Sequence, residues 1–142
     1  MHHLAIMNPK WHLIEKILRG EKTIESRWYK NKISPWDKIQ KGDIVYFKDA
    51  GKLVTAKATV SHVIQTEIIQ LSDATNLINQ YQKDLCFTQD SLFNTSWLEG
   101  KRYVILIFLT KPETVEPFTI NKTGYGSACA WISIQNINAI KH

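Results

Sequence analysis

The sequence predicts an α+β fold: a small mixed or antiparallel β-barrel flanked by helices. Strand-like apolar or alternating runs recur roughly six times along the chain, and two helical patterns follow the first and the fourth of them. Most connections between these runs are short, which favours a barrel with helical insertions over a doubly wound sheet. The 142 residues, of which 44% are hydrophobic and 22% charged, are enough to bury one core.

The N-terminal part predicts a strand followed by a helix. Leu4–Met7 is a short apolar run. Asn8 and Pro9 then begin the helix, because Asn caps helix N-termini and Pro suits the first helical position. Gly20 ends it, since glycine readily adopts the positive φ found after helices. Apolar residues recur at helical spacing between these limits, so we expect a core face made of Trp11, Ile14, Ile17 and Leu18.

The stretch from Gly20 to Trp28 carries the most informative pattern in the chain. Side chains alternate between the faces of a strand, so Glu25 and Arg27 share one face with Thr23, and Lys22 lies at its edge. Charged groups are costly to bury unless they are paired. The pattern therefore indicates either a functional site or a buried ion-pair network that fixes the turn. The candidate catalytic residues are Lys22, Glu25 and Arg27.

The middle of the chain predicts two strands, a hairpin and a second helix. Lys41–Asp43 is a turn into the β-rich run 44–48, and 49–52 is a hairpin turn before the alternating run 53–63. The secondary structure of residues 64–71 is ambiguous from the sequence. A helix then begins at Ser72 and ends near Leu85, and 90–93 is compatible with a further turn. We interpret 1–142 as a single domain with a helical insertion at about 65–98.

The last third predicts a central strand and a small-residue segment. Arg102–Leu109 is almost continuously apolar, and Lys111 and Pro112 are expected to break the strand, because proline removes a ladder donor. Residues 115–118 read as a weak extended stretch, and 132–140 as a final strand or turn of helix. Between them, Trp131 is expected in the core, whereas Tyr125 is equally compatible with packing and with stacking on a base.

The positive charge is concentrated in the first third of the chain. Asn8–Lys48 holds 10 Lys and Arg residues against 5 Asp and Glu, whereas the rest holds 8 of each. This asymmetry favours an anionic partner, nucleic acid first, although a solvated basic surface is the alternative. The run Trp28–Lys32 alternates aromatics with lysines, which suits base stacking with phosphate contacts. Its alternative is a solvated loop whose aromatics fold back on the barrel.

Several classes of protein are disfavoured by the sequence. No apolar run approaches the ~20 residues of a membrane span, and the N-terminus does not resemble a signal peptide. Cys86 and Cys129 are widely separated, so reduced thiols in a cytoplasmic protein are expected rather than a disulfide. No Cys or His pair has metal-ligand spacing. We therefore expect neither a metal nor a cofactor.

The stretch from Gly20 to Arg27, with the helix before it, resembles the signature of the ASCH domain family, part of the PUA-like superfamily. The signature is Gly-x-Lys-x-x-Glu-x-Arg after a helix that ends Ile-Leu-x-Gly. Gly20, Lys22, Glu25 and Arg27 occupy its fixed positions, with Ile17 and Leu18 before them. Asn8–Trp11 is similar to the opening of one branch of the family, and Lys41–Tyr46 to the strand that follows the signature. The resemblance is clearest over about the first 63 residues.

The resemblance implies a PUA-like barrel that binds nucleic acid, most of all RNA, or a modified nucleoside, in a basic cleft beside the signature residues. The partner would be RNA or another single-stranded nucleic acid. The residues expected to contact it are Lys10, Arg27, Trp28, Tyr29, Lys30, Lys32, Lys48, Tyr125 and Ser127.

The alternative function is a metal-independent hydrolase, either a ribonuclease or an amidohydrolase acting on a modified nucleoside. Glu25 would be the base, Lys22 the acid and Arg27 the group that stabilises developing negative charge. The amidohydrolase branch of the family has a Thr nucleophile two residues before the Arg. This sequence has Glu25 there, and Thr23 could replace it only if the local geometry shifted.

Overall fold

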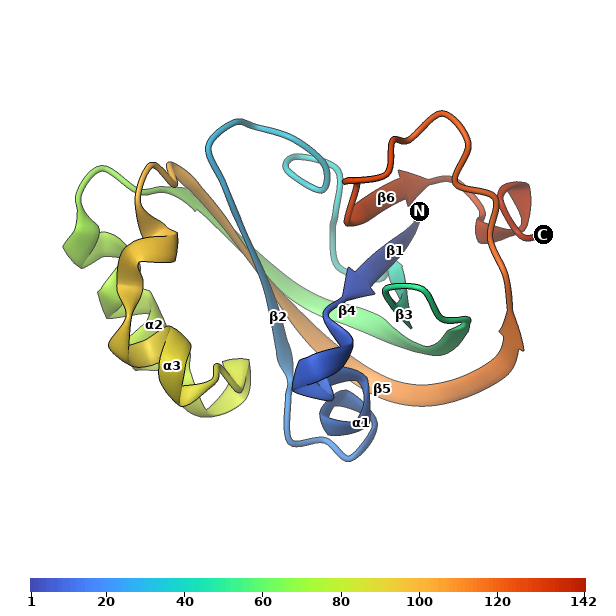
Figure 1. Ribbon diagram of the computed structural model, residues 1–142, viewed down its shortest axis with the longest axis horizontal. Coiled ribbons are helices and arrows are strands. Elements are labelled where there is room, and N and C mark those ends of the chain that lie inside the picture. Colours follow the sequence, from blue (N-terminus) through green and yellow to red (C-terminus); the bar gives the residue numbers. More distant parts are fainter.

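One mixed six-stranded β-sheet organises the computed structural model, which describes residues 1–142. The strand order is β2-β5-β4-β3-β1-β6; β1 and β3 are parallel, and the other neighbours are antiparallel. The sheet curls into a half-barrel (Figure 1). The strands are β1 (His2–Met7), β2 (Ile24–Tyr29), β3 (Ile44–Asp49), β4 (Val54–Glu67), β5 (Tyr103–Phe118) and β6 (Trp131–Ile134). The expected α+β barrel fold is confirmed.

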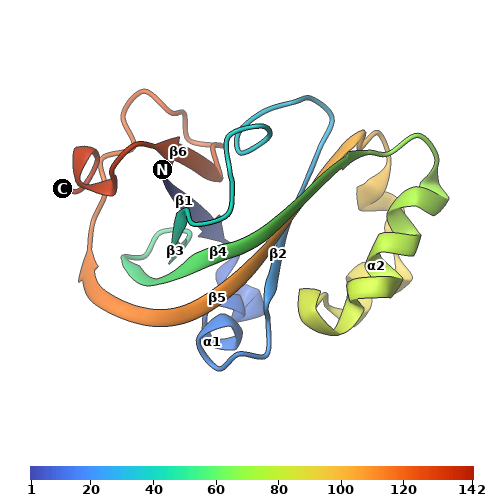
Figure 2. The same ribbon diagram turned by 180° about the vertical axis from the view of Figure 1, so that it is seen from behind.

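The helices lie in two places. The short 3-10 helix η1 (Pro9–Trp11) and α1 (Leu13–Leu18) connect β1 to β2, and η3 (Ile137–Ala139) follows β6. The remaining helices stand between β4 and β5: α2 (Leu71–Leu85), α3 (Gln89–Phe93) and η2 (Thr95–Leu98). This helical segment, residues 68–102, lies at the far end of the β4–β5 ribbon from both termini (Figures 1 and 2). None of the helices has the length and apolar character that a membrane crossing requires.

The buried side chains form three clusters, and one of them fixes the helical segment to the sheet. The barrel cluster contains Val45, Phe47, Ile105, Ile107 and Trp131, among others. A cluster at the opposite end of the barrel is made of Leu4, Val54, Ile132, Ile137 and Ile140. The third joins α2 and η2 to β2 and β5 through Ile24, Trp28, Ala74, Ile78, Leu85, Leu98, Val104 and Leu106. The segment thus shares a core with the strand that carries the signature.

The first helix differs from its prediction. Asn8 does cap a helical turn, and its side chain accepts a hydrogen bond from the Lys10 amide (3.0 Å). The turn is only η1, however, because His12 adopts a left-handed conformation (φ 53°) and α1 begins at Leu13. Trp11 consequently leaves the apolar face. Its side chain is 45% exposed, so the prediction that Trp11 packs in the core was wrong.

Strand β5 also differs from its prediction, because Pro112 does not end it. In the β4–β5 pairing, Thr110 lies opposite Thr59 and Glu113 opposite Lys57, so two residues of β5 face one of β4. Lys111 takes a positive φ of 52° in this bulge. A bulge leaves a residue outside the ladder, so the missing N–H of proline does no harm there. The expected break is instead a bend within a 16-residue strand.

Candidate functional site: a pocket between barrel and helical segment

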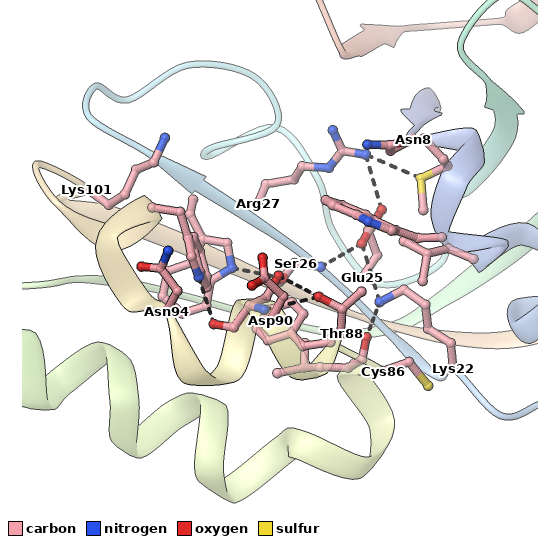
Figure 3. A pocket seen from close by; sticks show the side chains of 18 of the residues that line it. Asn8, Lys22, Glu25, Ser26, Arg27, Cys86, Thr88, Asp90, Asn94 and Lys101 are labelled. Carbon is pink, nitrogen blue, oxygen red and sulfur yellow. Dashed lines mark hydrogen bonds and ion pairs between the residues drawn. The ribbon is translucent and has the colours of Figure 1, made fainter.

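A pocket of about 630 Å³ lies beside β2, with the end of β1 and η1 on one side and the helical segment on the other. In Figure 3 the Arg27 side chain of β2 reaches toward Asn8, and Thr88, Asp90 and Asn94 lie on the side of the helical segment. β2 is an edge strand of the half-barrel, and these two connections line the pocket beside it.

Lys22 is buried at the base of this pocket, with 2% of its surface exposed. Its Nζ donates hydrogen bonds to the carbonyl oxygens of Ile24 (2.7 Å) and Leu85 (2.6 Å) and lies 3.6 Å from Glu25 Oε1. Burial lowers the pKa of the Lys22 amine, and the neighbouring Glu25 carboxylate opposes that change. Lys22 therefore ties the start of β2 to the C-terminal end of α2.

Glu25 is the central acceptor of the site. Its Oε1 accepts a hydrogen bond from the Ser26 amide (3.0 Å), and its Oε2 accepts one from Arg27 Nη2 (3.1 Å). Burial would raise the pKa of the Glu25 carboxyl, but the charges of Lys22 and Arg27 and these hydrogen bonds lower it below its usual value. Glu25 is therefore held as a carboxylate between two cations.

Arg27 joins the two open edges of the half-barrel. From the edge strand β2, its Nη1 donates to the Ala130 carbonyl just before β6 (3.2 Å), and its Nη2 reaches the Ile6 carbonyl in β1 (3.5 Å). The guanidinium also lies 5.0 Å from the centre of the Trp131 ring, a cation–π contact. Its Nε is buried and has no hydrogen-bond partner in the protein. This free donor lies on a side chain that lines the pocket.

Proton transfer is not what this arrangement suits best. A general acid or base must reach its proton with a pKa matched to the task. The Lys22 amine is engaged by two carbonyl oxygens and the carboxylate, and Glu25 accepts from several donors that lower its pKa. Thr23 is not among the residues that line the pocket. Both candidate proton-transfer groups are therefore already engaged by protein partners.

The other walls of the pocket are aromatic and polar. Trp11, Trp28 and Trp97 all line it, and the Trp28 and Trp97 rings meet edge to face at 5.5 Å. Residues 85–101 add polar groups that the sequence reasoning missed: Thr88, Asp90, Ser91, Asn94, Ser96 and Lys101. They are far from the signature along the chain, and a compact polar run after α2 is the only sign of them in the sequence.

The structure brings some of the predicted site residues together and leaves others apart. Lys22, Glu25, Arg27, Trp28 and Tyr29 line the pocket. Burial raises the pKa of the Tyr29 hydroxyl, so it stays protonated as a donor.

The remaining predicted contacts lie elsewhere. Lys10, Lys30 and Lys32 are exposed and outside the lining. Lys48 lines a second cavity of about 380 Å³, and burial lowers the pKa of its amine. Tyr125 and Ser127 are exposed in the connection between β5 and β6.

Comparison with known proteins finds similarity of structure only. No protein-family model matches the sequence, and no curated protein matches it either. The crystal structure of an ASCH protein from Zymomonas mobilis superposes with a TM-score of 0.68 at 12% identity, covering 99% of this chain and 96% of that chain. A mutant of that protein gives a TM-score of 0.70. A hypothetical protein, PH0355, gives 0.52 at 21% identity, over 81% of this chain and 100% of that chain.

Proposed function

Because the chain has the ASCH-domain fold, we propose that it is a nucleic-acid-binding domain whose preferred partner is single-stranded RNA. The pocket beside Lys22, Glu25 and Arg27 receives one unpaired nucleotide. The observation that carries this proposal is the composition of the pocket, which is lined by tryptophan rings, by Arg27 and by polar side chains of the helical segment.

The size and chemistry of the pocket suit a nucleotide. Its volume of about 630 Å³ falls within the ~300–1,000 Å³ typical of small-ligand sites. Proteins that recognise single-stranded RNA stack splayed bases on aromatic rings and hydrogen-bond their edges. Trp11, 45% exposed, offers a ring for stacking, and Asp90 and Asn94 offer hydrogen-bonding groups for a base edge. The Arg27 guanidinium lines the pocket and offers a positive charge for a phosphate oxygen.

The test is fluorescence anisotropy of a labelled single-stranded RNA at about 50 mM and about 200 mM salt. Affinity should fall with salt, with a log–log slope of roughly 0.7 for each phosphate contacted. Trp11→Ala should weaken binding roughly 5- to 100-fold, as expected when one stacked base is lost. Phe93→Ala, which removes an exposed aromatic (84%, against 45% for Trp11) outside the pocket lining, is the control. Absent binding, or binding that ignores salt, contradicts the proposal.

The hydrolase alternative has weaker support. It requires Glu25 to take a proton and Lys22 to give one, whereas both groups are held by neighbouring charges and carbonyl oxygens. Incubating RNA with the protein in the presence of a chelator separates the two functions. Binding alone predicts intact RNA. Cleavage that disappears in both Glu25→Gln and Lys22→Ala, in protein that is still folded, would support the hydrolase.

A further inference from the structure

Four cationic side chains lie together where the end of β2 meets the start of β5, next to the pocket. They are Lys30, Lys32, Lys101 and Arg102, and we call them the basic track. Building on the proposed function, we propose that the basic track binds the phosphates of a single strand that leaves the pocket. The ligand is then an oligonucleotide with one nucleotide in the pocket, rather than a free nucleoside.

The contacts of these residues form a continuous path. Lys101 lines the pocket itself, at its rim (Figure 3). The Lys30 side chain passes over Gly100, where a Cβ would lie 3.2 Å from Lys30 Cε. The Arg102 amide donates to the Tyr29 carbonyl (2.8 Å), which holds the start of β5 beside the end of β2. The path therefore begins inside the pocket and continues onto the outer surface.

Lys32 and Arg102 extend the path around one aromatic ring. The Lys32 ammonium lies 5.5 Å from the centre of the Tyr103 ring, and the Arg102 guanidinium lies 5.9 Å from it. Lys32 also lies 5.7 Å from the Trp36 ring. A cation–π contact orients a cation without neutralising it. Both charges are therefore exposed and unneutralised beside the same ring.

None of the four cations is neutralised by an ion pair. The ion pairs in the protein involve other residues, and no side-chain hydrogen bond engages these four. Lys30, Lys32 and Arg102 are exposed, and Lys101 is half-buried. The nearest carboxylates by sequence or strand pairing are Glu99 and Glu67, and neither forms an ion pair with them. A cluster of unpaired positive charges next to a nucleotide-sized pocket is suited to binding phosphodiesters.

The experiment compares a charge-neutralised track with a matched control. Lys30→Gln, Lys32→Gln and Arg102→Gln are combined in one variant, and Lys101, which lines the pocket, is left unchanged. The control combines Lys52→Gln, Lys83→Gln and Lys111→Gln, three exposed lysines outside the pocket lining. Both variants remove three positive charges. The probes are a short single-stranded RNA oligonucleotide, a nucleoside monophosphate and polyglutamate, each titrated across salt concentrations.

For the RNA oligonucleotide, neutralising the track should lower the salt slope by roughly 2, at about 0.7 per phosphate contact, and the control variant should retain most of the slope. The nucleoside monophosphate should bind the wild type and the track variant within about 3-fold of each other, since it stays in the pocket.

Three results would overturn the basic track. One is an unchanged RNA slope in the track variant; another is an equal loss of RNA affinity in the control. The third is polyglutamate competing as well as RNA, which would indicate an acidic protein partner. By contrast, failure of the wild type to bind any nucleic-acid probe would remove the proposed function itself, so the two failures are distinguishable.

Discussion

Lys22 is held by main-chain and side-chain partners on both sides of the pocket. A lysine ammonium has three donors, and here two reach main-chain carbonyls while the third faces Glu25. Glu25 in turn holds the Arg27 guanidinium. We infer that Lys22 and Glu25 are positioning residues and that Arg27 is the member of the three that contacts a ligand.

The first prediction concerns the charge balance of this trio. Glu25→Gln leaves the buried Lys22 ammonium without its counter-charge, and breaking such a pair typically costs about 3–5 kcal/mol. The free energy of unfolding, measured by urea denaturation near neutral pH, should fall by roughly that amount. Glu99→Gln, at an exposed carboxylate, is the control and should change it by less than about 0.5 kcal/mol. A Glu25 variant as stable as the wild type would show that the ion-pair network is not structural.

The second prediction separates two tryptophans of the same pocket. Trp28 is 9% exposed and belongs to a core cluster, so Trp28→Ala should lower the free energy of unfolding by about 3–5 kcal/mol. Trp11 is 45% exposed, so Trp11→Ala should weaken RNA binding and leave stability within about 1 kcal/mol. Thermal melts and anisotropy titrations of both variants check this. If Trp11→Ala instead lowered stability and Trp28→Ala weakened RNA binding at unchanged stability, the assigned roles of the two tryptophans would be wrong.

The sequence correctly indicated that Lys22, Glu25 and Arg27 lie close together, but it placed Trp11 wrongly. Both outcomes depend on how far local geometry determines the environment of a residue. Lys22, Glu25 and Arg27 lie within six residues, so local strand geometry determines their shared environment. Trp11 depends on where the helix begins. Its spacing from Ile14 and Ile17 fits a helical face, but the left-handed conformation of His12 interrupts the helix between them. Periodicity alone does not reveal such a break.

At the scale of the elements, the helical segment decides what kind of cavity the signature faces. The sequence predicts α2 and the later turn from periodicity and caps, but not the wall they form. That wall depends on contacts such as the bond from Lys22 to Leu85, which are 63 residues apart. The bulge at Pro112 was missed for the same kind of reason, because it depends on the register with β4.

The third prediction tests whether the helical segment is fixed through its core. Leu85, in α2, is fully buried in the cluster shared with β2, so Leu85→Ala should cost about 2–5 kcal/mol. It should also weaken RNA binding, because loss of this packing lets the end of α2, whose main-chain carbonyl anchors Lys22, move away from β2. Leu71→Ala, on the same helix but 57% exposed, is the matched control and should change stability by less than about 0.5 kcal/mol. Denaturation and anisotropy measure the two effects. Equal behaviour of the two variants would contradict the shared core.

For the whole molecule, a buried histidine in β1 sets a pH dependence of stability. His3 is fully buried; its Nε2 donates to Asp43 Oδ2 (2.8 Å), and its Nδ1 accepts from Ser133 Oγ (2.9 Å). Burial lowers the pKa of the His3 imidazole below 6.5, and the contact with Asp43 only partly opposes it. The unfolded chain therefore takes up a proton at a pH where the folded chain does not.

The fourth prediction follows from the lowered pKa of His3 in the folded protein. The free energy of unfolding should fall as the pH is lowered from about 6.5, by at most about 1.4 kcal/mol per pH unit for this group. His2, whose pKa burial also lowers, adds to the effect in the same direction. His3→Gln should flatten the curve of melting temperature against pH between about pH 6.5 and pH 5, whereas His142→Gln should not. A curve of unchanged slope in His3→Gln contradicts this account.

The central claim is that nucleic acid enters the pocket beside the Lys22–Glu25–Arg27 trio. Photocrosslinking of a single-stranded RNA with photoreactive bases, followed by mass spectrometry, tests it most directly. The account predicts crosslinks on peptides that contain Trp11, Trp28 or Trp97, the tryptophans that line the pocket. Crosslinks confined to other surfaces, such as the second cavity around Lys48, would contradict it.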